Sequence, residues 1–86
     1  MESRAFIKAT AALIRKIEES QSTIESADDL RIRRELLQKE VTQLFNGLQN
    51  PTLPSAYRLR DTALRNGFSV DTKTQHRLSQ YEHITH

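Results

Sequence analysis

The sequence predicts an all-α fold, with two helices folded into an antiparallel hairpin and one or two shorter helices packed across it as a small helical bundle. Three observations predict this arrangement. Apolar residues recur at steps of three and four along two long stretches, and a short polar segment with helix-capping residues separates the stretches. Beyond them, two prolines and a glycine divide the rest of the chain into helix-sized pieces.

The first predicted helix begins near Ser3 and ends near Glu25. Its apolar seam follows alternating steps of four and three, which is the spacing of a narrow helix–helix contact. The seam consists of Phe6, Thr10, Leu13, Ile17, Ser20 and Ile24. Ile7 and Ile14 each lie one position further along and widen the seam. Four alanines in this stretch favour a helix and allow a neighbouring helix to approach closely.

The turn of the hairpin is predicted at Ser26. The hydroxyl of Ser26 is placed to cap the next helix, and the carboxylates of Asp28 and Asp29 favour the positive end of that helix. Ser26 and Asp29 also have the spacing of a capping box. The second helix is then predicted to run to about Leu48.

The second predicted helix carries more apolar surface than one partner helix covers. Its seam is Leu30, Arg34, Leu37, Val41, Leu44 and Leu48. Ile32, Leu36 and Phe45 fall on flanking positions outside this seam. Because a two-helix hairpin cannot cover them all, we expect a third element or a second subunit against this helix.

Arg34 interrupts the seam of the second helix, and two interpretations stay open. In the first, Arg34 forms a polar layer with Ser20 and Gln21, which fixes the register of the hairpin. In the second, its long side chain reaches past the seam to water.

Residues 50–54 contain both prolines, which end the second helix and form a linker. Pro54 suits the first position of a third helix, which is predicted to end at Asn66. Gly67 is placed as the left-handed stop of that helix, and Phe68 as the apolar contact beyond the stop.

A final helix is predicted from Val70 to about His83, with Ser69 as its cap and an end that frays. The whole chain, residues 1–86, is therefore predicted to be one small domain. The hairpin covers residues 3–49, the linker residues 50–54 and the C-terminal helices residues 54–84.

Length and composition limit how this chain can be stabilised. It has 86 residues, of which 36% are apolar, and it has no cysteine. A chain of this length buries only about 60–65% of its unfolded surface. Small domains with thin cores usually add disulfides, a metal or a partner chain. Since disulfides are excluded here, we expect oligomerisation or partner binding.

The sequence gives no indication of a membrane protein. No stretch approaches the ~20 apolar residues of a membrane span. The first eight residues are too charged to begin the apolar core of a signal peptide. We therefore expect a cytoplasmic protein that does not bind membranes.

The segment from Ala63 to Ser69 has a small residue, three variable residues, then Gly67 and Phe68. It resembles the helix-turn-helix of bacterial regulators, in which the small residue allows close packing and the glycine turns the chain. The resemblance implies that the next helix faces a DNA groove or phosphates. The residues so offered would be Asp71, Thr72, Lys73, Gln75, His76 and Arg77.

The segment departs from the helix-turn-helix pattern at Lys73 and His76, where the second helix needs apolar residues that pack inward. An ordinary glycine stop followed by a capped helix is the alternative interpretation.

Positive charge is concentrated in the C-terminal third. Residues 1–50 carry eight basic and eight acidic side chains, whereas residues 51–86 carry five basic and three acidic ones. The candidate nucleic-acid contacts are Arg58, Arg60, Arg65, Lys73 and Arg77. To bind nucleic acid, these five side chains would have to share one connected surface.

The sequence contains no recognisable catalytic or metal-binding motif. It has no cysteine nucleophile, no glycine-rich phosphate loop and no Gly-x-Ser-x-Gly elbow. His76 and His83 lie about 10 Å apart along a helix, too far to share one ion. His83 and His86 are three apart, but no cysteine or acidic cluster joins them. We expect no enzyme, no cofactor, no metal and no small-molecule substrate.

The function expected from these observations is that of a non-enzymatic protein-interaction module, such as a small adaptor, chaperone-like protein or inhibitor. It would bind a protein partner or itself by helix–helix packing. The candidate partner-binding residues are Ile7, Ile14, Ile32, Leu36 and Phe45. Two alternatives stay open: a DNA- or RNA-binding regulator that uses the C-terminal third, and a permanent structural subunit of a larger assembly.

Overall fold

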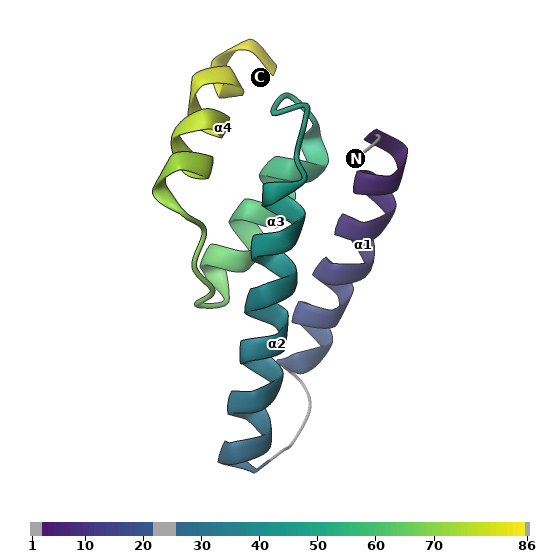
Figure 1. Cartoon of the computed structure of the whole chain (residues 1–86), viewed down its shortest axis with the longest axis vertical. Coiled ribbons are helices and arrows are strands. Elements are labelled where there is room, and N and C mark those ends of the chain that lie inside the picture. The colour runs from purple at the N-terminus through teal and green to yellow at the C-terminus, as the bar shows by residue number, and fades with distance from the viewer. Residues whose placement is uncertain (1–2, 22–25, 86) are drawn as a thin grey trace.

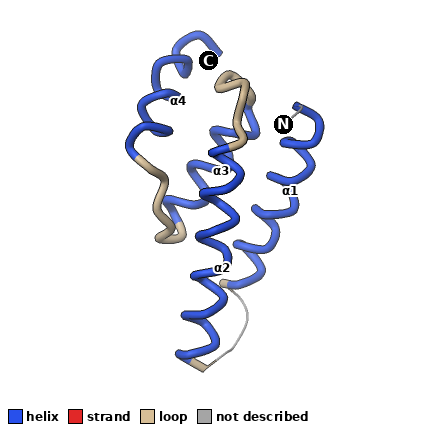
Figure 2. The backbone as a smooth tube through the Cα atoms, viewed as in Figure 1, coloured by secondary structure: helices blue, strands red, loops and turns tan. Residues whose placement is uncertain are grey.

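The computed structural model describes residues 3–21 and 26–85, and over these residues the chain is entirely helical apart from turns and loops (Figures 1 and 2). The four helices are α1 (Ser3–Ser20), α2 (Ala27–Asn46), α3 (Pro54–Arg65) and α4 (Thr72–Thr85). They form a small all-α bundle with extents of 43 × 24 × 20 Å, which confirms the predicted fold class.

Helices α1 and α2 form the predicted hairpin. Ser26 caps α2, since its hydroxyl oxygen accepts a hydrogen bond of 3.2 Å from the backbone N–H of Asp29. Helix α1 ends at Ser20, earlier than the expected end near Glu25. Ile24, the last member of the predicted seam, lies outside the described residues.

The predicted seam of α1 is buried because α3 packs across it as well as α2. Phe6, Thr10, Leu13, Ile17 and Ser20 are at most 5% exposed. The matching stripe of α3 consists of Ala56, Leu59 and Ala63, which are fully buried. The small alanines let α3 approach α1 closely, and α3 lies behind the hairpin in Figure 1.

Helix α2 is buried only from Leu37 onward. Leu37, Val41, Leu44 and Phe45 lie in the core, together with Leu48 just beyond the helix. Leu30, which the seam pattern places inside, is instead 38% exposed. The reason is visible in Figure 1, where the first turns of α2 extend past the end of α1 and past α3.

The end of α3 follows the predicted glycine stop. Gly67 has a φ of +84°, the left-handed region that favours glycine, and the backbone N–H of Phe68 donates to the carbonyl of Ala63 at 2.8 Å. Phe68 is 4% exposed and supplies the expected apolar contact.

Helix α4 begins two residues later than predicted and has a different cap. It starts at Thr72 rather than at Val70, and the cap is Asp71 rather than Ser69, since the Asp71 carboxylate accepts from the backbone N–H of Thr74. The backbone of Ser69 instead forms hydrogen bonds with the Gln38 side chain of α2. Val70 is free to turn inward and is buried.

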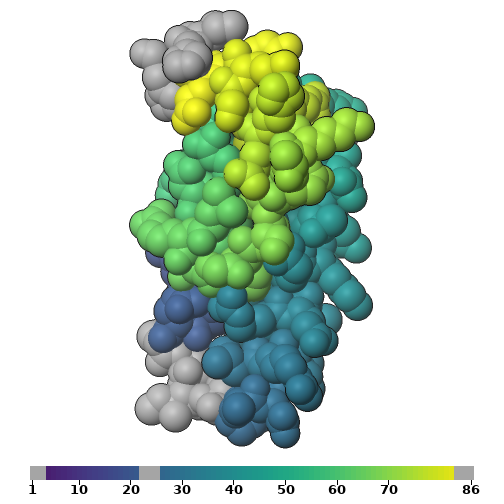
Figure 3. Space-filling model, turned by 90° about the vertical axis from the view of Figure 1, so that its left-hand side faces the viewer, coloured from purple at the N-terminus to yellow at the C-terminus, as the bar shows by residue number. Residues whose placement is uncertain are grey.

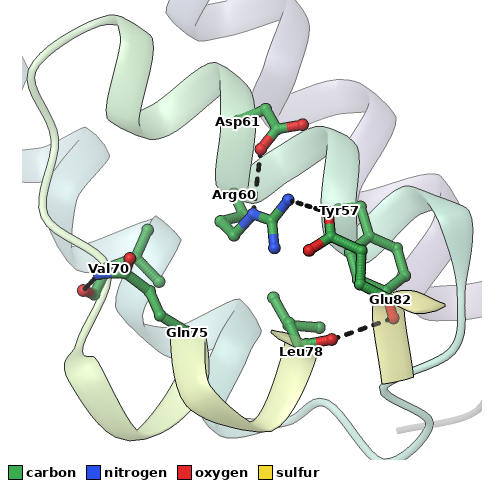
Figure 4. A network of polar contacts seen from close by, with 7 residues as sticks. All are labelled: Tyr57, Arg60, Asp61, Val70, Gln75, Leu78 and Glu82. Atoms are coloured by element: carbon green, nitrogen blue, oxygen red, sulfur yellow. Dashed lines mark hydrogen bonds and ion pairs between the residues drawn. The ribbon is translucent and has the colours of Figure 1, made fainter. Parts of the chain in front are cut away.

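Side-chain contacts fasten α4 to α3 (Figure 4). The Tyr57 hydroxyl donates to the carbonyl of Leu78 at 3.3 Å, and Leu78 itself is fully buried. Arg60 forms ion pairs of 3.0 Å with both Asp61 and Glu82. Burial lowers the pKa of Arg60, but the hydrogen bonds and charges of Glu82 and Asp61 outweigh burial, so the pKa lies above its usual value.

We expect Leu13→Ala to lower the free energy of unfolding by about 2–4 kcal/mol, because it leaves a cavity between α1, α2 and α3. Leu64→Ala is the matched control, since Leu64 is 42% exposed on α3. Urea denaturation of both variants measures the difference. A loss below about 0.5 kcal/mol for Leu13→Ala would contradict the assigned core.

The cap of α4 makes an acid-sensitive contribution to stability. Hydrogen bonds from the backbone and the hydroxyl of Thr74 hold the pKa of Asp71 below its usual value. A lowered folded-state pKa adds stability above the unfolded pKa of about 4, and that stability is lost as the pH falls through the folded pKa. Asp71→Ala should cost about 1 kcal/mol at neutral pH.

Asp71→Asn separates the cap from its charge, because asparagine also caps helices but does not titrate. We expect wild type to lose stability relative to Asp71→Asn between neutral pH and about pH 3. Urea denaturation at the two pH values measures this. A constant difference between wild type and Asp71→Asn would show that the cap does not lower the pKa of Asp71 in the folded state.

Candidate interaction surface

The structure separates the five predicted partner-binding residues into two groups. Ile7, Ile32 and Leu36 are exposed, at 44%, 53% and 57% respectively. Ile14 and Phe45 are only 6% exposed and belong to the core. The expectation that these two lie on an open surface is therefore corrected, and the reason is that the third helix supplies the cover that the hairpin alone lacked.

Ile32 and Leu36 lie over a groove between α1 and α2. They are four residues apart on α2 and so share one face of that helix. The groove has a volume of about 600 Å³, and Leu37 lies at its buried side. Its rim carries charges of both signs: Lys16, Glu19, Asp29, Arg33 and Glu40.

A second hollow continues the groove toward the other end of the hairpin. It has a volume of about 380 Å³ and is lined by Ala9, Ala12 and Leu13 of α1 and by Gln43 and Leu44 of α2. Lys16 and Glu40 line both hollows, and their ion pair of 3.0 Å bridges α1 and α2 between them.

We refer to the two hollows and their lining as the hairpin face. Its members are Ala9, Ala12, Leu13, Lys16, Glu19, Asp29, Ile32, Arg33, Leu36, Leu37, Glu40, Gln43 and Leu44. In Figure 1, α3 lies behind the hairpin and α4 lies beside α3, so neither covers this face. Figure 3 shows the flank formed by α3 and α4, with α2 visible along one edge.

Ile7 does not belong to the hairpin face. It lies seven residues before Ile14, and both therefore point to the same side of α1. Ile14 lines a different hollow, together with Arg58 of α3. Of the predicted residues, the structure thus brings together only Ile32 and Leu36. Sequence reasoning missed Ala9 and Ala12 as part of the surface, although their small size was the signal that something packs closely there.

The five candidate nucleic-acid contacts do not gather on one surface. Arg60 is directed at Glu82 of α4, with only 13% of its side chain exposed. Arg77 donates to the carbonyls of Leu48 and Gln49 at 2.9 and 3.1 Å, in the loop that follows α2. These two side chains serve the fold.

The other three basic side chains lie apart from Arg60 and Arg77. Arg58 and Arg65 line hollows against α1, each beside Glu18, and Lys73 is exposed on α4. With Arg60 and Arg77 engaged within the fold, Arg58, Arg65 and Lys73 are the candidates that remain for a basic surface.

The segment that resembles a helix-turn-helix keeps only the turn. Ala63 is fully buried, and Gly67 ends α3 as the pattern requires. Lys73 and His76, however, are exposed, and the buried residues between Gly67 and Glu82 are Phe68, Val70 and Leu78. The second helix therefore packs by a different face from that of the motif.

Two side chains of α2 hold this turn in place. The Arg34 guanidinium donates to the carbonyl of Asn66 at 2.9 Å and lies over the ring of Phe68, 4.4 Å from its centroid. One helical turn later, the Gln38 amide donates to the carbonyl of Ser69 at 2.9 Å and accepts from its N–H at 2.8 Å. We call these contacts of Arg34 and Gln38 the turn clamp.

The contacts of Arg34 in the turn clamp differ from both interpretations that the sequence left open. Ser20, the proposed partner in a polar layer, donates its hydroxyl to the carbonyl of Ile17 within its own helix. Arg34 neither joins that layer nor points to water, because the end of α3 lies close enough for Arg34 to donate to the carbonyl of Asn66. The signal that sequence reasoning lacked was the position of α3.

Two further findings concern the described residues. Over residues 3–21 and 26–85, no three histidine, cysteine or acidic side chains lie close enough together to hold a metal ion. Over the same ranges, no helix combines the length and the apolar character that a membrane span requires.

The fold and this surface define a small all-α protein of four helices with one uncovered hairpin face. Comparison with protein-family models, with curated proteins and with solved structures finds no match to the chain.

We expect Arg34→Lys to lower the free energy of unfolding by about 1–2 kcal/mol, because lysine replaces neither the planar stacking on Phe68 nor the directed hydrogen bond to Asn66. Arg31→Lys is the control, since Arg31 is exposed on the same helix and pairs weakly with Asp28 at 3.6 Å. Equal stability of the two variants in urea denaturation would show that the turn clamp does not stabilise the fold.

Proposed function

We propose that this chain is a non-enzymatic protein-interaction module that binds its partner by helix packing on the hairpin face. The observation that carries the proposal is the exposure of Ile32 and Leu36, each more than half exposed and adjacent on one face of α2. Large apolar side chains that gather over a groove mark contact sites. Because each is already about half buried, covering the exposed remainder is worth roughly 1–1.5 kcal/mol each in a complex.

The rim of the hairpin face supports the same proposal. Charges of both signs surround the apolar centre, and an apolar centre with a polar rim is typical of protein interfaces. A membrane surface would instead favour a basic rim with aromatic anchors. The lining has no aromatic side chain among its described members.

Leu36→Glu tests the proposal. We expect it to abolish association while circular dichroism keeps its helical signal, since Leu36 is 57% exposed. Leu64→Glu is the control, because Leu64 is similarly exposed but lies on α3. Phe45→Glu should behave differently and unfold the chain, because it buries a charge in the core.

Association is read in two ways: sedimentation of the purified chain across concentration, and capture of host proteins by the tagged chain. A protein retained by wild type and by Leu64→Glu but lost with Leu36→Glu would support the proposal. If all three retain the same proteins and sediment identically, the hairpin face is not a binding surface.

A further inference from the structure

We propose that Asn46 is a site of spontaneous deamidation in the folded chain, and that the turn clamp protects Asn66 from the same reaction. Each of these two asparagines is followed directly by a glycine, Gly47 and Gly67 respectively. The two sites therefore share the same local chemistry, and the structure around them decides which one reacts. The reaction does not depend on the proposed function, since Asn46 does not line the hairpin face.

Deamidation begins when the backbone nitrogen of the glycine attacks the side-chain carbonyl carbon of the asparagine before it. The new C–N bond closes a five-membered succinimide ring, the glycine nitrogen loses its proton, and the side-chain nitrogen leaves as ammonia. Water then opens the ring at either carbonyl, which gives aspartate or isoaspartate. Glycine favours the attack because it has no Cβ and leaves the backbone free to rotate. Water is the only co-reactant.

The attack requires the glycine N–H to leave the hydrogen bonds that close the end of each helix. Gly47 donates to the carbonyls of Gln43 and Leu44, both at 3.1 Å. Gly67 donates to the carbonyl of Leu64 at 3.2 Å. Each asparagine must also rotate out of its folded conformation to bring its side chain onto the glycine nitrogen. The reaction therefore proceeds through local opening, and its rate follows the free energy of that opening.

Asn66 is held both by its side chain and by its backbone carbonyl. Its side-chain amide donates to the carbonyl of Thr62 at 2.8 Å, and Arg34 of the turn clamp donates to its carbonyl at 2.9 Å. Just beyond it, the backbone N–H of Phe68 donates to the carbonyl of Ala63 at 2.8 Å. The amide that would be attacked and the backbone that would have to rotate are thus both bound.

Asn46 is the last residue of α2, and its side chain is exposed. No described residue forms a hydrogen bond with its side-chain amide. The next anchor of the chain is Leu48, which is buried and whose carbonyl accepts from Arg77 at 2.9 Å. That anchor lies beyond Gly47 and holds neither reacting group. Asn66 consequently has to lose two hydrogen bonds, at its amide and at its carbonyl, that have no counterpart at Asn46.

Reaction at Asn46 changes the end of α2 in two ways. It places a carboxylate at the C-terminal end of the helix, where a negative charge is unfavourable because the helix dipole is itself negative there. In isoaspartate, the main chain also gains one methylene between α2 and the buried Leu48. The modified chain is therefore expected to hold Leu48 and its contact with Arg77 less tightly.

Peptide mapping of the whole folded chain over time tests this assignment. Trypsin cleaves after Arg58 and after Arg65, so Asn46 and Asn66 fall in different peptides, and mass spectrometry follows the conversion of amide to carboxyl in each. We expect Asn46 to react at least about tenfold faster than Asn66, because two additional hydrogen bonds must break at Asn66. Equal rates at the two sites of the folded chain would overturn the proposal.

Two controls accompany the mapping. In urea both Asn-Gly pairs are exposed alike, and they should react at similar rates. An Asn46 that stays intact in the folded chain while the chain in urea reacts would contradict the proposal. Gly47→Ala should slow the reaction at Asn46, since the φ of −90° at Gly47 suits alanine but the added Cβ hinders the attack.

Arg34→Lys tests the protective role of the turn clamp. Because lysine does not replace the directed hydrogen bond to the carbonyl of Asn66, we expect Asn66 to react at least about threefold faster, with the rate at Asn46 unchanged. Arg31→Lys, exposed on the same helix, is the control and should change neither rate. Equal acceleration of both asparagines would mean that unfolding of the whole chain sets the rates. That result, or an unchanged rate at Asn66, would overturn the protection by the clamp.

Discussion

The arrangement of this protein depends on the turn clamp, by which Arg34 and Gln38 of α2 hold the chain between α3 and α4. The clamp satisfies the carbonyl of Asn66 at the end of α3, which is partly buried, and it binds both backbone groups of Ser69. It also fixes on which side of α2 the C-terminal helices lie. Everything on the opposite side of α2 is consequently left open, and that side carries Ile32 and Leu36.

The role of α2 explains why so short a chain both folds and exposes apolar surface. Its inner side packs against α1 and α3 from Leu37 onward, and its first turns project beyond them. A helix that ended flush with its neighbours would not hold a groove with α1 at this point. The mixed charges on the rim keep the exposed apolar residues separated by polar ones, and the apolar surface is therefore confined to a narrow stripe.

Sequence reasoning recovered the features that local chemistry determines. The seam of α1 from Phe6 to Ser20, the Ser26 cap and the Gly67 stop each depend on a few neighbouring residues, and the structure has all of them. It failed where the position of a residue depends on contacts with residues that are distant in the sequence. Phe45 and Ile14 could not be assigned to the core without the position of α3, and Arg34 could not be paired with Asn66. The later start of α4 also involves a contact distant in sequence, because the Gln38 side chain accepts a hydrogen bond from the backbone N–H of Ser69.

Helix α4 is attached differently from the rest of the bundle. Beyond Leu78, its described contacts are mainly polar: Tyr57 and Arg60 from α3, and Arg77 reaching the end of α2. Partly exposed ion pairs and single hydrogen bonds each contribute little net stability. Leu78 is thus the buried apolar side chain of α4 among its described residues, and elements with few buried apolar contacts generally open before the rest of a fold. Detachment would uncover Val70 and Leu78 together, which gives the chain a second, transient apolar surface on the side remote from the hairpin.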